Sequence, residues 1–468
     1  MPSRGVMIQT LQTLLERYTD IRSETLMGYA GVLASDMMRG RMPGDSGYRL
    51  AMDYVIQCFR NNGVQPGLAD GTYEQPFCME TCRVRSAEVV LETAIGETRR
   101  LSLGADYVCR GLTGDGDVSG EPAFVGYCSD DEEFNELNGV DLDGKIAVSF
   151  KHPPPWHETR RPVLPRRKAH LLRERGAVGL VIVPNPNLSR PERLSASLVE
   201  EGEYIPGFPM IVLADQPADA MMHFDNQTLA GRQFAIDTER RICSGPVPGR
   251  ISIRIDTEHA SDGLSWNAVG YLPGTDPEIA DECVVIGAHL DHVGIQGESV
   301  IFNGAQDNAS GVAAVLEIAR TFAAGPRPRR SLRFVLFGAE EAGLLGSMHY
   351  AKNAPHPLDR TPAMLNLDCM GAGSGGDFRG RSAHPHLFEI LDEMNSKFVN
   401  VPDTRADHPA GGADAKPFED AGIPNVYFVT SDAYRHLHMA GDTVDTLNPG
   451  VFEKITRLAY LTAANLVI

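Results

Sequence analysis

The sequence lacks any apolar run of about 18 residues, the length that a membrane-spanning helix needs. It is also short of basic residues, because 43 Lys and Arg stand against 62 Asp and Glu, for a formal net charge of −19. An acidic chain is a poor candidate for binding nucleic acid or an anionic membrane surface, since both would repel it. We therefore expect neither kind of partner.

No Cys-x-x-Cys pair occurs among the eight cysteines, so their spacing does not indicate a cysteine-based metal site. Buried free thiols are the expected state, with a disulfide or two if the protein is exported. The first residues, Met1–Gln9, also lack the apolar segment of a secretion signal. As written, the chain is expected to be cytoplasmic, or exported if a signal segment has been removed.

The length and texture of the chain predict more than one folded part. Its 468 residues exceed one ordinary core, and 42% hydrophobic with 22% charged residues is typical of a soluble globular protein. We assign residues 1–80 to an N-terminal helical part of a larger domain. Residues 81–246 carry short β-type runs and one evident helix, Arg166–Arg175, and are predicted to be a small β-rich insertion. Residues 247–468 form the main part of the larger domain.

The last part alternates strands with helices, which predicts an α/β fold with a doubly wound, mostly parallel sheet covered on both faces. Ligands of such sheets bind beyond the carboxyl ends of the strands. The expected strands are Asn267–Leu272, Val284–Ala288, Leu332–Phe337, Ala363–Leu367 and Asn425–Val429. The expected helices are Gly311–Ala323, Ala342–Asn353, Pro385–Val399, Ala415–Ala421 and Val451–Leu466.

Acidic and imidazole side chains follow the expected strands at corresponding places. They are His289 with Asp291, Asp307, Glu340 with Glu341, Asp368, and His438 with Asp442. Histidine and carboxylate together are zinc ligands, for which manganese or cobalt can substitute. This convergence predicts a metal site at one edge of the sheet.

The residues also suggest separate roles. Asp307 lies in a Gly/Asn/Ser turn and is the candidate to bridge two ions about 3.5–4 Å apart. Glu340 stands beside a ligand and is the candidate to take a proton from water. Asp291 lies two residues after His289, so its carboxylate is expected to accept a hydrogen bond from that imidazole and fix its tautomer.

Each residue also has an ordinary structural explanation. A histidine after a strand is usually a core or surface residue, an acidic pair suits a helix N-terminus, and Asp307 could be a helix N-cap. It is the corresponding placement of all of them that favours a metal site. We interpret His292 as a loop residue or a support for the ligands, and His436 as a rival to His438.

The same blocks resemble the M28 metallopeptidases, a family of zinc aminopeptidases and carboxypeptidases. The resemblance implies a zinc exopeptidase fold with two Zn²⁺ ions and Glu340 as general base. It implies that one zinc is held by His289, Asp307 and Asp368, and the other by Asp307, Glu341 and His438. The insertion is similar to a PA (protease-associated) domain. The matching blocks are Ala288–Gly294, Gly304–Gly311, Phe337–Ser347, Leu365–Asp368 and His438–Thr443.

Two departures from the family pattern concern specificity rather than metal binding. Leu437 stands before the last ligand where the family often has Tyr, and Ala413-Asp414-Ala415 replaces the usual Ser-Asp-His. We expect a peptide substrate and, within the family, an aminopeptidase in which water bridging the metals attacks the scissile carbonyl.

A carboxypeptidase or dipeptidase of the same fold is the alternative. A carboxypeptidase needs a cationic pocket for the terminal carboxylate, and the matching blocks contain no Arg. The nearby candidates for such a pocket are Arg379, Arg381, Arg405 and Arg435. A glutaminyl cyclase or a non-catalytic binding homologue is less favoured, because all five ligand positions and Glu340 are present.

Overall fold

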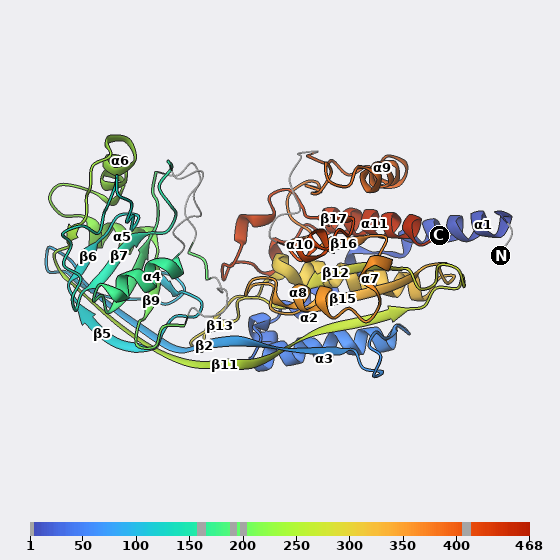
Figure 1. Cartoon of the computed structure of the whole chain (residues 1–468), viewed down its shortest axis with the longest axis horizontal. Coiled ribbons are helices and arrows are strands. Elements are labelled where there is room, and N and C mark those ends of the chain that lie inside the picture. The colour runs from blue at the N-terminus through green and yellow to red at the C-terminus, as the bar shows by residue number, and fades with distance from the viewer. Residues whose placement is uncertain (1–3, 157–164, 188–193, 197–203, 405–412) are drawn as a thin grey trace. The chain divides into compact units, whose positions relative to one another are not determined.

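The computed structural model describes residues 4–156, 165–187, 194–196, 204–404 and 413–468. The chain divides into two compact units (Figure 1). Unit 1 comprises residues 1–79, 262–294 and 301–468, and unit 2 comprises residues 80–261 and 295–300. The chain leaves unit 1 within strand β2 (Glu74–Glu92) and returns within strand β11 (Arg250–Leu272), which are neighbours in one sheet. The limits expected from the sequence are 1–80, 81–246 and 247–468. They differ from these units mainly at the point where the chain returns to unit 1, which lies at Asp262 rather than at residue 247.

The sheet of unit 1 has the strand order β11-β15-β12-β16-β17. Strands β15 (Ser331–Phe337), β12 (Cys283–His289), β16 (Met364–Leu367) and β17 (Asn425–Phe428) run parallel, whereas the end of β11 is antiparallel to β15. All residues of the four parallel strands are buried, as expected where helices cover both faces of a sheet.

Helices pack on the two faces of this sheet through separate apolar clusters. Alternate residues of β12 show the division, because Val284 and Ile286 join one cluster and Val285 joins the other. The larger cluster is covered by α1 (Arg4–Glu16), α2 (Ser23–Leu33), α3 (Ser46–Asn61), α7 (Gly311–Ala323), α9 (Pro385–Met394) and α11 (Pro449–Leu466). The smaller cluster is covered by α8 (Leu345–Lys352) and α10 (Ala415–Asp420). The predicted doubly wound α/β fold is therefore confirmed.

Most predicted elements of unit 1 agree with the structure, although β11 begins 17 residues before its predicted start and α9 ends at Met394 rather than at Val399. Helix α7 has the predicted bounds, and the four parallel strands lie within one residue of their predicted ends. Helix α8 begins at Leu345, three residues later than predicted, because Gly343 and Leu344 both have positive φ angles that a helix does not allow. The residues before it form the turn that carries Glu340 and Glu341.

Unit 2 contains more helix than its sequence suggested. Its six-stranded sheet has the order β10-β6-β7-β8-β9-β4, with β10 (Gly245–Pro246) and β4 (Tyr107–Cys109) at its edges. The four strands between them run parallel: β6 (Pro122–Phe124), β7 (Ile146–Phe150), β8 (Gly179–Val183) and β9 (Met210–Leu213). The expected helix is α4 (Pro165–Glu174), but α5 (Asp215–Met222) and α6 (Leu229–Glu239) were not predicted. The description of this part as β-rich was therefore incomplete, and its likeness to a PA domain stays a prediction.

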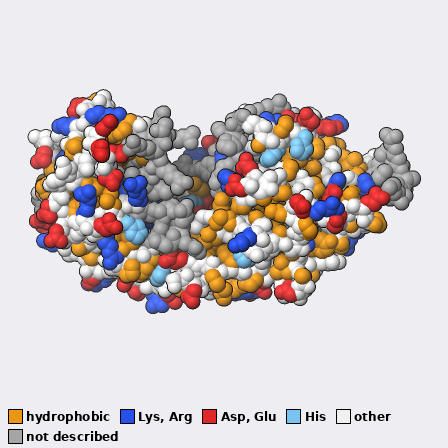
Figure 2. Space-filling model, viewed as in Figure 1, with side chains coloured by type: hydrophobic (Ala, Val, Ile, Leu, Met, Phe, Trp, Pro, Cys, Tyr) orange, Lys and Arg blue, Asp and Glu red, His pale blue; other side chains and the backbone are white. Residues whose placement is uncertain are grey.

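The cysteines are in the free state that the sequence predicted, and most of them are buried. All eight cysteines are free and lie within the described residues; six are buried, Cys243 is half-buried and Cys78 is exposed. On the face shown in Figure 2, basic side chains are interspersed with acidic ones. Among the described helices, none is both long and apolar enough to span a membrane.

Candidate metal centre

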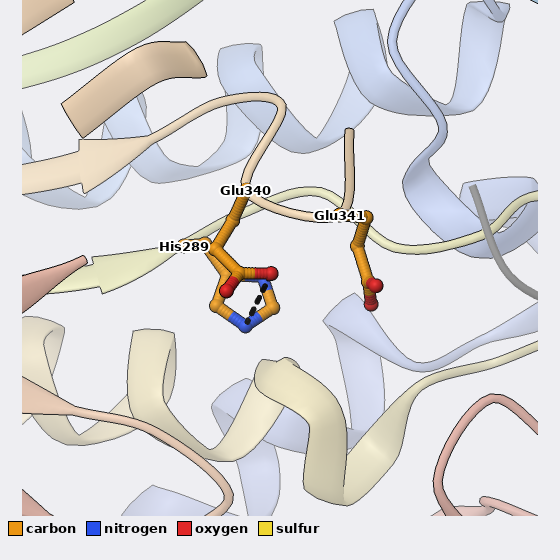
Figure 3. Close-up of side chains that lie close together, drawn as sticks. All are labelled: His289, Glu340 and Glu341. Carbon is orange, nitrogen blue, oxygen red and sulfur yellow. Dashed lines mark ion pairs between the residues drawn. The ribbon is translucent and has the colours of Figure 1, made fainter. Parts of the chain in front are cut away.

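The ends of the parallel strands of unit 1 bring the predicted ligands together. His289 ends β12, the turn with Glu340 and Glu341 follows β15, and Asp368 follows β16. His438 comes from the loop after the short helix η6 (Ala433–His436). Figure 3 shows both glutamates extending from one turn, with the Glu340 carboxylate next to the His289 ring.

Asp307 enters the site from a tight turn, η3 (Ala305–Ser310), that precedes α7. Gly304 starts this turn with φ +60°, and a Cβ there would lie 2.3 Å from the Asp307 main-chain oxygen. The Asp307–Asn308 peptide bond is cis. The Asn308 side chain donates to Leu367 O at 3.0 Å and accepts from the Gly311 N–H at 2.8 Å. The turn is thereby fixed to the strand end that carries Asp368.

The two oxygens of Asp307 face different histidines. Oδ1 lies 3.2 Å from Nε2 of His289, which is also 3.4 Å from Oδ1 of Asp368. Oδ2 lies 3.3 Å from Nε2 of His438, which is also 2.8 Å from Oε2 of Glu341. Asp307 is thus shared between two three-residue groups.

The side chain of His292 also reaches this cluster. The sequence had suggested two roles for it, a loop residue or a support for the ligands. Its Nδ1 lies 2.9 Å from Oε1 of Glu341 and 3.8 Å from Oδ2 of Asp307. His292, Asp307 and Glu341 therefore form one group able to hold a metal. His289 forms a second group with Asp307 and Asp368, and a third with Glu340 and Glu341. Neither His436 nor His438 belongs to these three groups of described residues, and His438 joins the site through its contacts with Asp307 and Glu341.

The donor atoms fit zinc in kind and in spacing. Zinc lies about 2.0–2.2 Å from nitrogen and oxygen ligands, so tetrahedral ligands are about 3.3–3.6 Å from one another. The contacts of His289 with Asp307 and Asp368, and of His438 with Asp307, span 3.2–3.4 Å, whereas His438 and Glu341 lie closer, at 2.8 Å. In addition, Oδ1 of Asp368 is buried without a hydrogen-bond donor among the described residues. A cation between these atoms would satisfy it.

Two buried aspartates hold the turns that carry the ligands. The Asp291 carboxylate accepts from the main-chain N–H groups of Glu340 at 3.0 Å and Glu341 at 3.2 Å. The Asp442 carboxylate accepts in the same way from Gln306 at 2.9 Å and Asp307 at 3.0 Å. Each turn is therefore anchored through two amides.

The expectation that the Asp291 carboxylate orients the His289 ring was wrong. The carboxylate lies 3.8 Å from Nδ1 of His289, beyond hydrogen-bond distance. The ring nitrogen is instead 3.2 Å from the main-chain oxygen of Asp291, which can accept its proton. The carboxylate is directed to the amides of a turn 49 and 50 residues later in the chain.

The buried charges shift one another's protonation strongly. Burial raises the pKa of Glu340 well above its usual value, and the carboxylates of Glu341 and Asp414 raise it further against the opposing effect of His289. Although burial opposes the change, His438 lowers the pKa of Glu341 to about 2. Glu340 therefore holds a proton more readily than the ligand beside it.

Arg41 lies beneath the ligand loops and is fully buried. Its guanidinium donates to four main-chain oxygens at 2.7–2.9 Å: Leu33, Leu290, Asn303 and Gly304. Burial lowers its pKa to about 10, and the neighbouring carboxylates oppose that change. Arg41 therefore remains a cation at neutral pH while joining the loop after β12 to the loop before Asp307.

Two of the arginines considered for a carboxylate pocket pair with aspartates, a third is exposed, and the fourth lies outside the described residues. Arg379 pairs with Asp377 at 3.1 Å, and Arg381 pairs with Asp392 and Asp403, each at 2.8 Å. Arg435 is exposed on η6, and Arg405 lies outside the described residues. Asp414, from the segment that departs from the family pattern, is buried, and burial raises its pKa to about 7.

Comparison with known proteins identifies the part of the chain that carries this site. The model of peptidase family M28 matches residues 267–463, which include all the ligands described above. This part of the chain is similar to peptidase family M28.

Curated relatives match part of this chain at moderate identity. Leupeptin-inactivating enzyme 1 of Streptomyces exfoliatus is 33% identical over 178 residues, which are 36% of this chain and 37% of the relative. Aminopeptidase YwaD of Bacillus subtilis (strain 168) is 26% identical over 306 residues, 63% of this chain and 55% of the relative. A probable glutamate carboxypeptidase of Arthroderma benhamiae is 30% identical over 161 residues, 33% of this chain and 20% of the relative. The chain thus spans between a fifth and about half of these relatives' lengths.

A solved structure shares the fold along nearly the whole chain. The aminopeptidase from Aneurinibacillus sp. strain AM-1 matches with a TM-score of 0.67 and 20% sequence identity. The match covers 97% of this chain and 95% of that chain. This likeness extends the assignment of the fold beyond residues 267–463.

Proposed function

We propose that the chain is a dizinc aminopeptidase that releases N-terminal residues from peptides. The observation that carries the proposal is Asp307, whose two oxygens belong to two separate ligand groups. His289 and Asp368 complete one group, and Glu341 and His438 complete the other. A carboxylate shared in this way is the usual link between two catalytic metal ions.

Bound zinc would polarise the scissile carbonyl and make a water molecule acidic near neutral pH. Glu340 is suited to handle the proton, because its carboxylate lies 4.0 Å from Nε2 of His289 and outside the two ligand groups that share Asp307. A carboxylate at this place can accept a proton from water and return it to the leaving amine. The main-chain bond from its N–H to Asp291 fixes its position.

The side chains around the ligands favour an aminopeptidase over a carboxypeptidase. Arg41 is buried and already donates to four main-chain oxygens. Arg379 and Arg381 are paired with aspartates. By contrast, the carboxyl groups of Glu340 and Asp414 interact with His289, and their oxygens can accept hydrogen bonds from the ammonium group of a peptide N-terminus.

The test combines substrate choice with a variant of the base. Zinc-loaded protein is assayed on aminoacyl-anilides and on N-blocked peptides that have a free carboxylate. Cleavage of the first set alone supports the proposal. Cleavage that requires a free carboxylate and ignores N-blocking favours a carboxypeptidase, the activity for which the Arthroderma benhamiae relative is named.

The variant E340Q should keep both zinc ions and lose at least about 10²-fold in kcat, the scale of a lost general base. E278Q is the matched control, because Glu278 is exposed and its side chain has no assigned role. Turnover by E340Q close to that of E278Q would remove Glu340 from the mechanism.

A further inference from the structure

Each terminal carboxylate of the site has one oxygen occupied by a hydrogen bond. The Tyr427 hydroxyl donates to Oδ2 of Asp368 at 2.8 Å, while Oδ1 faces His289 at 3.4 Å. Nδ1 of His292 lies 2.9 Å from Oε1 of Glu341, while Oε2 faces His438 at 2.8 Å. In both carboxylates, the oxygen directed at the metal position is the one without this bond.

Tyr427 is held firmly enough to orient its acceptor. It lies on β17 in parallel register with Asn366 of β16, is 2% exposed, and packs with Cys369 and Ala413 in a small core cluster. The Arg379 guanidinium covers its ring at 5.2 Å. Ala413 stands in the segment where the sequence departs from the family pattern, and its small side chain packs beside this tyrosine.

His292 is equally confined. Its side chain is fully buried, and a Cβ at Gly304 would lie 2.5 Å from its ring, so the glycine leaves room for the imidazole. To donate to Glu341 the ring must carry its proton on Nδ1. Its Nε2 has no hydrogen-bond partner among the described residues.

A carboxylate can bind a metal ion through one oxygen or through both, and a hydrogen bond to one oxygen disfavours the second mode. We propose that Tyr427 and His292 are positioning residues that hold Asp368 and Glu341 as one-oxygen ligands, one for each ion. The inference rests on the proposed dizinc function. One-oxygen binding leaves coordination positions open for substrate, as a catalytic zinc site requires.

The competing reading makes His292 itself a ligand in place of His438. The distances favour His438, whose Nε2 lies 3.3 Å from Oδ2 of Asp307, compared with 3.8 Å for Nδ1 of His292. His438 is also the more accessible ring, since its side chain is 19% exposed and that of His292 is 0% exposed.

Zinc dissociation constants of the full chain, measured by competition with a chromophoric chelator, test the proposal. Y427F removes one hydroxyl, and Y350F is the matched control because the buried Tyr350 hydroxyl has no hydrogen-bond partner among the described residues. H292L removes the donor to Glu341, whereas H292N keeps an N–H near the position of Nδ1. Thermal unfolding without metal shows that each variant folds.

We expect Y427F and H292L each to raise the dissociation constant of one of the two zinc ions about 10–100-fold. The dissociation constants of Y350F and H292N should stay within about 3-fold of those of the wild type. In a D368A background, Y427F should add no further loss and H292L should still weaken the other ion. If H292N loses zinc as fully as H292L, His292 is a ligand and its positioning role is wrong.

Unchanged zinc constants in Y427F and H292L, in a wild type that binds two zinc ions and cleaves peptides, would overturn the inference and leave the proposed function intact. Fewer than two zinc ions in the wild type would contradict the proposed function, and the inference would fail with it.

Discussion

Replacing Arg41 should destabilise unit 1 more than any surface change, because its side chain is fully buried and joins three segments of chain. It donates to main-chain oxygens of Leu33, Leu290, Asn303 and Gly304. Met resembles the apolar stem of Arg and has no donors, so R41M would leave all four oxygens buried without their partner. R41K keeps the positive charge but has one donor nitrogen instead of the three nitrogens of the guanidinium group.

The size of the effect follows from the contacts. A hydrogen bond from a charged group contributes about 1.5–3 kcal/mol, so four such bonds would sum to about 6–12 kcal/mol. That sum is too large, because folding also removes the guanidinium from water. Breaking a buried charged network by deleting one partner costs about 3–5 kcal/mol, and we expect R41M to lose that much free energy of unfolding. R41K should fall between R41M and the wild type.

The two tryptophans allow each unit to be followed separately, because Trp266 lies in unit 1 and Trp156 in unit 2. Urea unfolding of metal-free protein, with Trp266 as the only tryptophan, reports on unit 1. A loss of less than about 1 kcal/mol in R41M would refute the reasoning, because it would mean that the four oxygens find other partners.

Three further outcomes are expected. D442A removes the acceptor of two amides in the Asp307 turn, so it should weaken zinc affinity about 10-fold or more in the chelator competition. An unchanged zinc affinity would contradict this anchoring role. Burial raises the pKa of Glu136 from 4.5 to about 7, so the folded chain keeps a proton that the unfolded chain has lost. The free energy of unfolding of unit 2, reported by Trp156, should therefore fall as the pH rises from about 4.5 to about 7, and E136Q should lack that fall. G304A should disrupt the same turn, because its Cβ would meet a main-chain oxygen at 2.3 Å; zinc binding equal to the wild type would show that the turn adapts.

The sequence predicted unit 1 well because its strands and helices have strong apolar patterns. The run Gly311–Ala323 has the spacing of an amphipathic helix and has the predicted bounds. Strands β2 and β11 were predicted only in part, because their middle residues are polar and show no apolar pattern. Such strands pair through main-chain hydrogen bonds, which the side-chain pattern does not reveal. Helix α5 was missed because it is short and contains a proline.

His289, Glu341 and Asp368 could be predicted because each ends or follows a parallel strand at the same edge of the sheet, whereas Asp307 and His438 come from the turn η3 and the loop after η6. Their supports could not, because these contacts join residues far apart in the chain. Asp291 was expected to orient the ring of His289, its near neighbour in sequence. Its carboxylate instead accepts hydrogen bonds from main-chain amides 49 and 50 residues away. Tyr427 carries no sequence signal beyond a β-type position, and only the register of β16 and β17 brings it to Asp368.

The most direct test of the account is diffraction from zinc-loaded crystals at the zinc absorption edge. The account predicts two anomalous peaks about 3.5–4 Å apart, one on each side of the Asp307 carboxylate. One peak would lie beside His289 and Asp368, and the other beside Glu341 and His438. A single peak, or two peaks that do not share Asp307, would contradict the central claim.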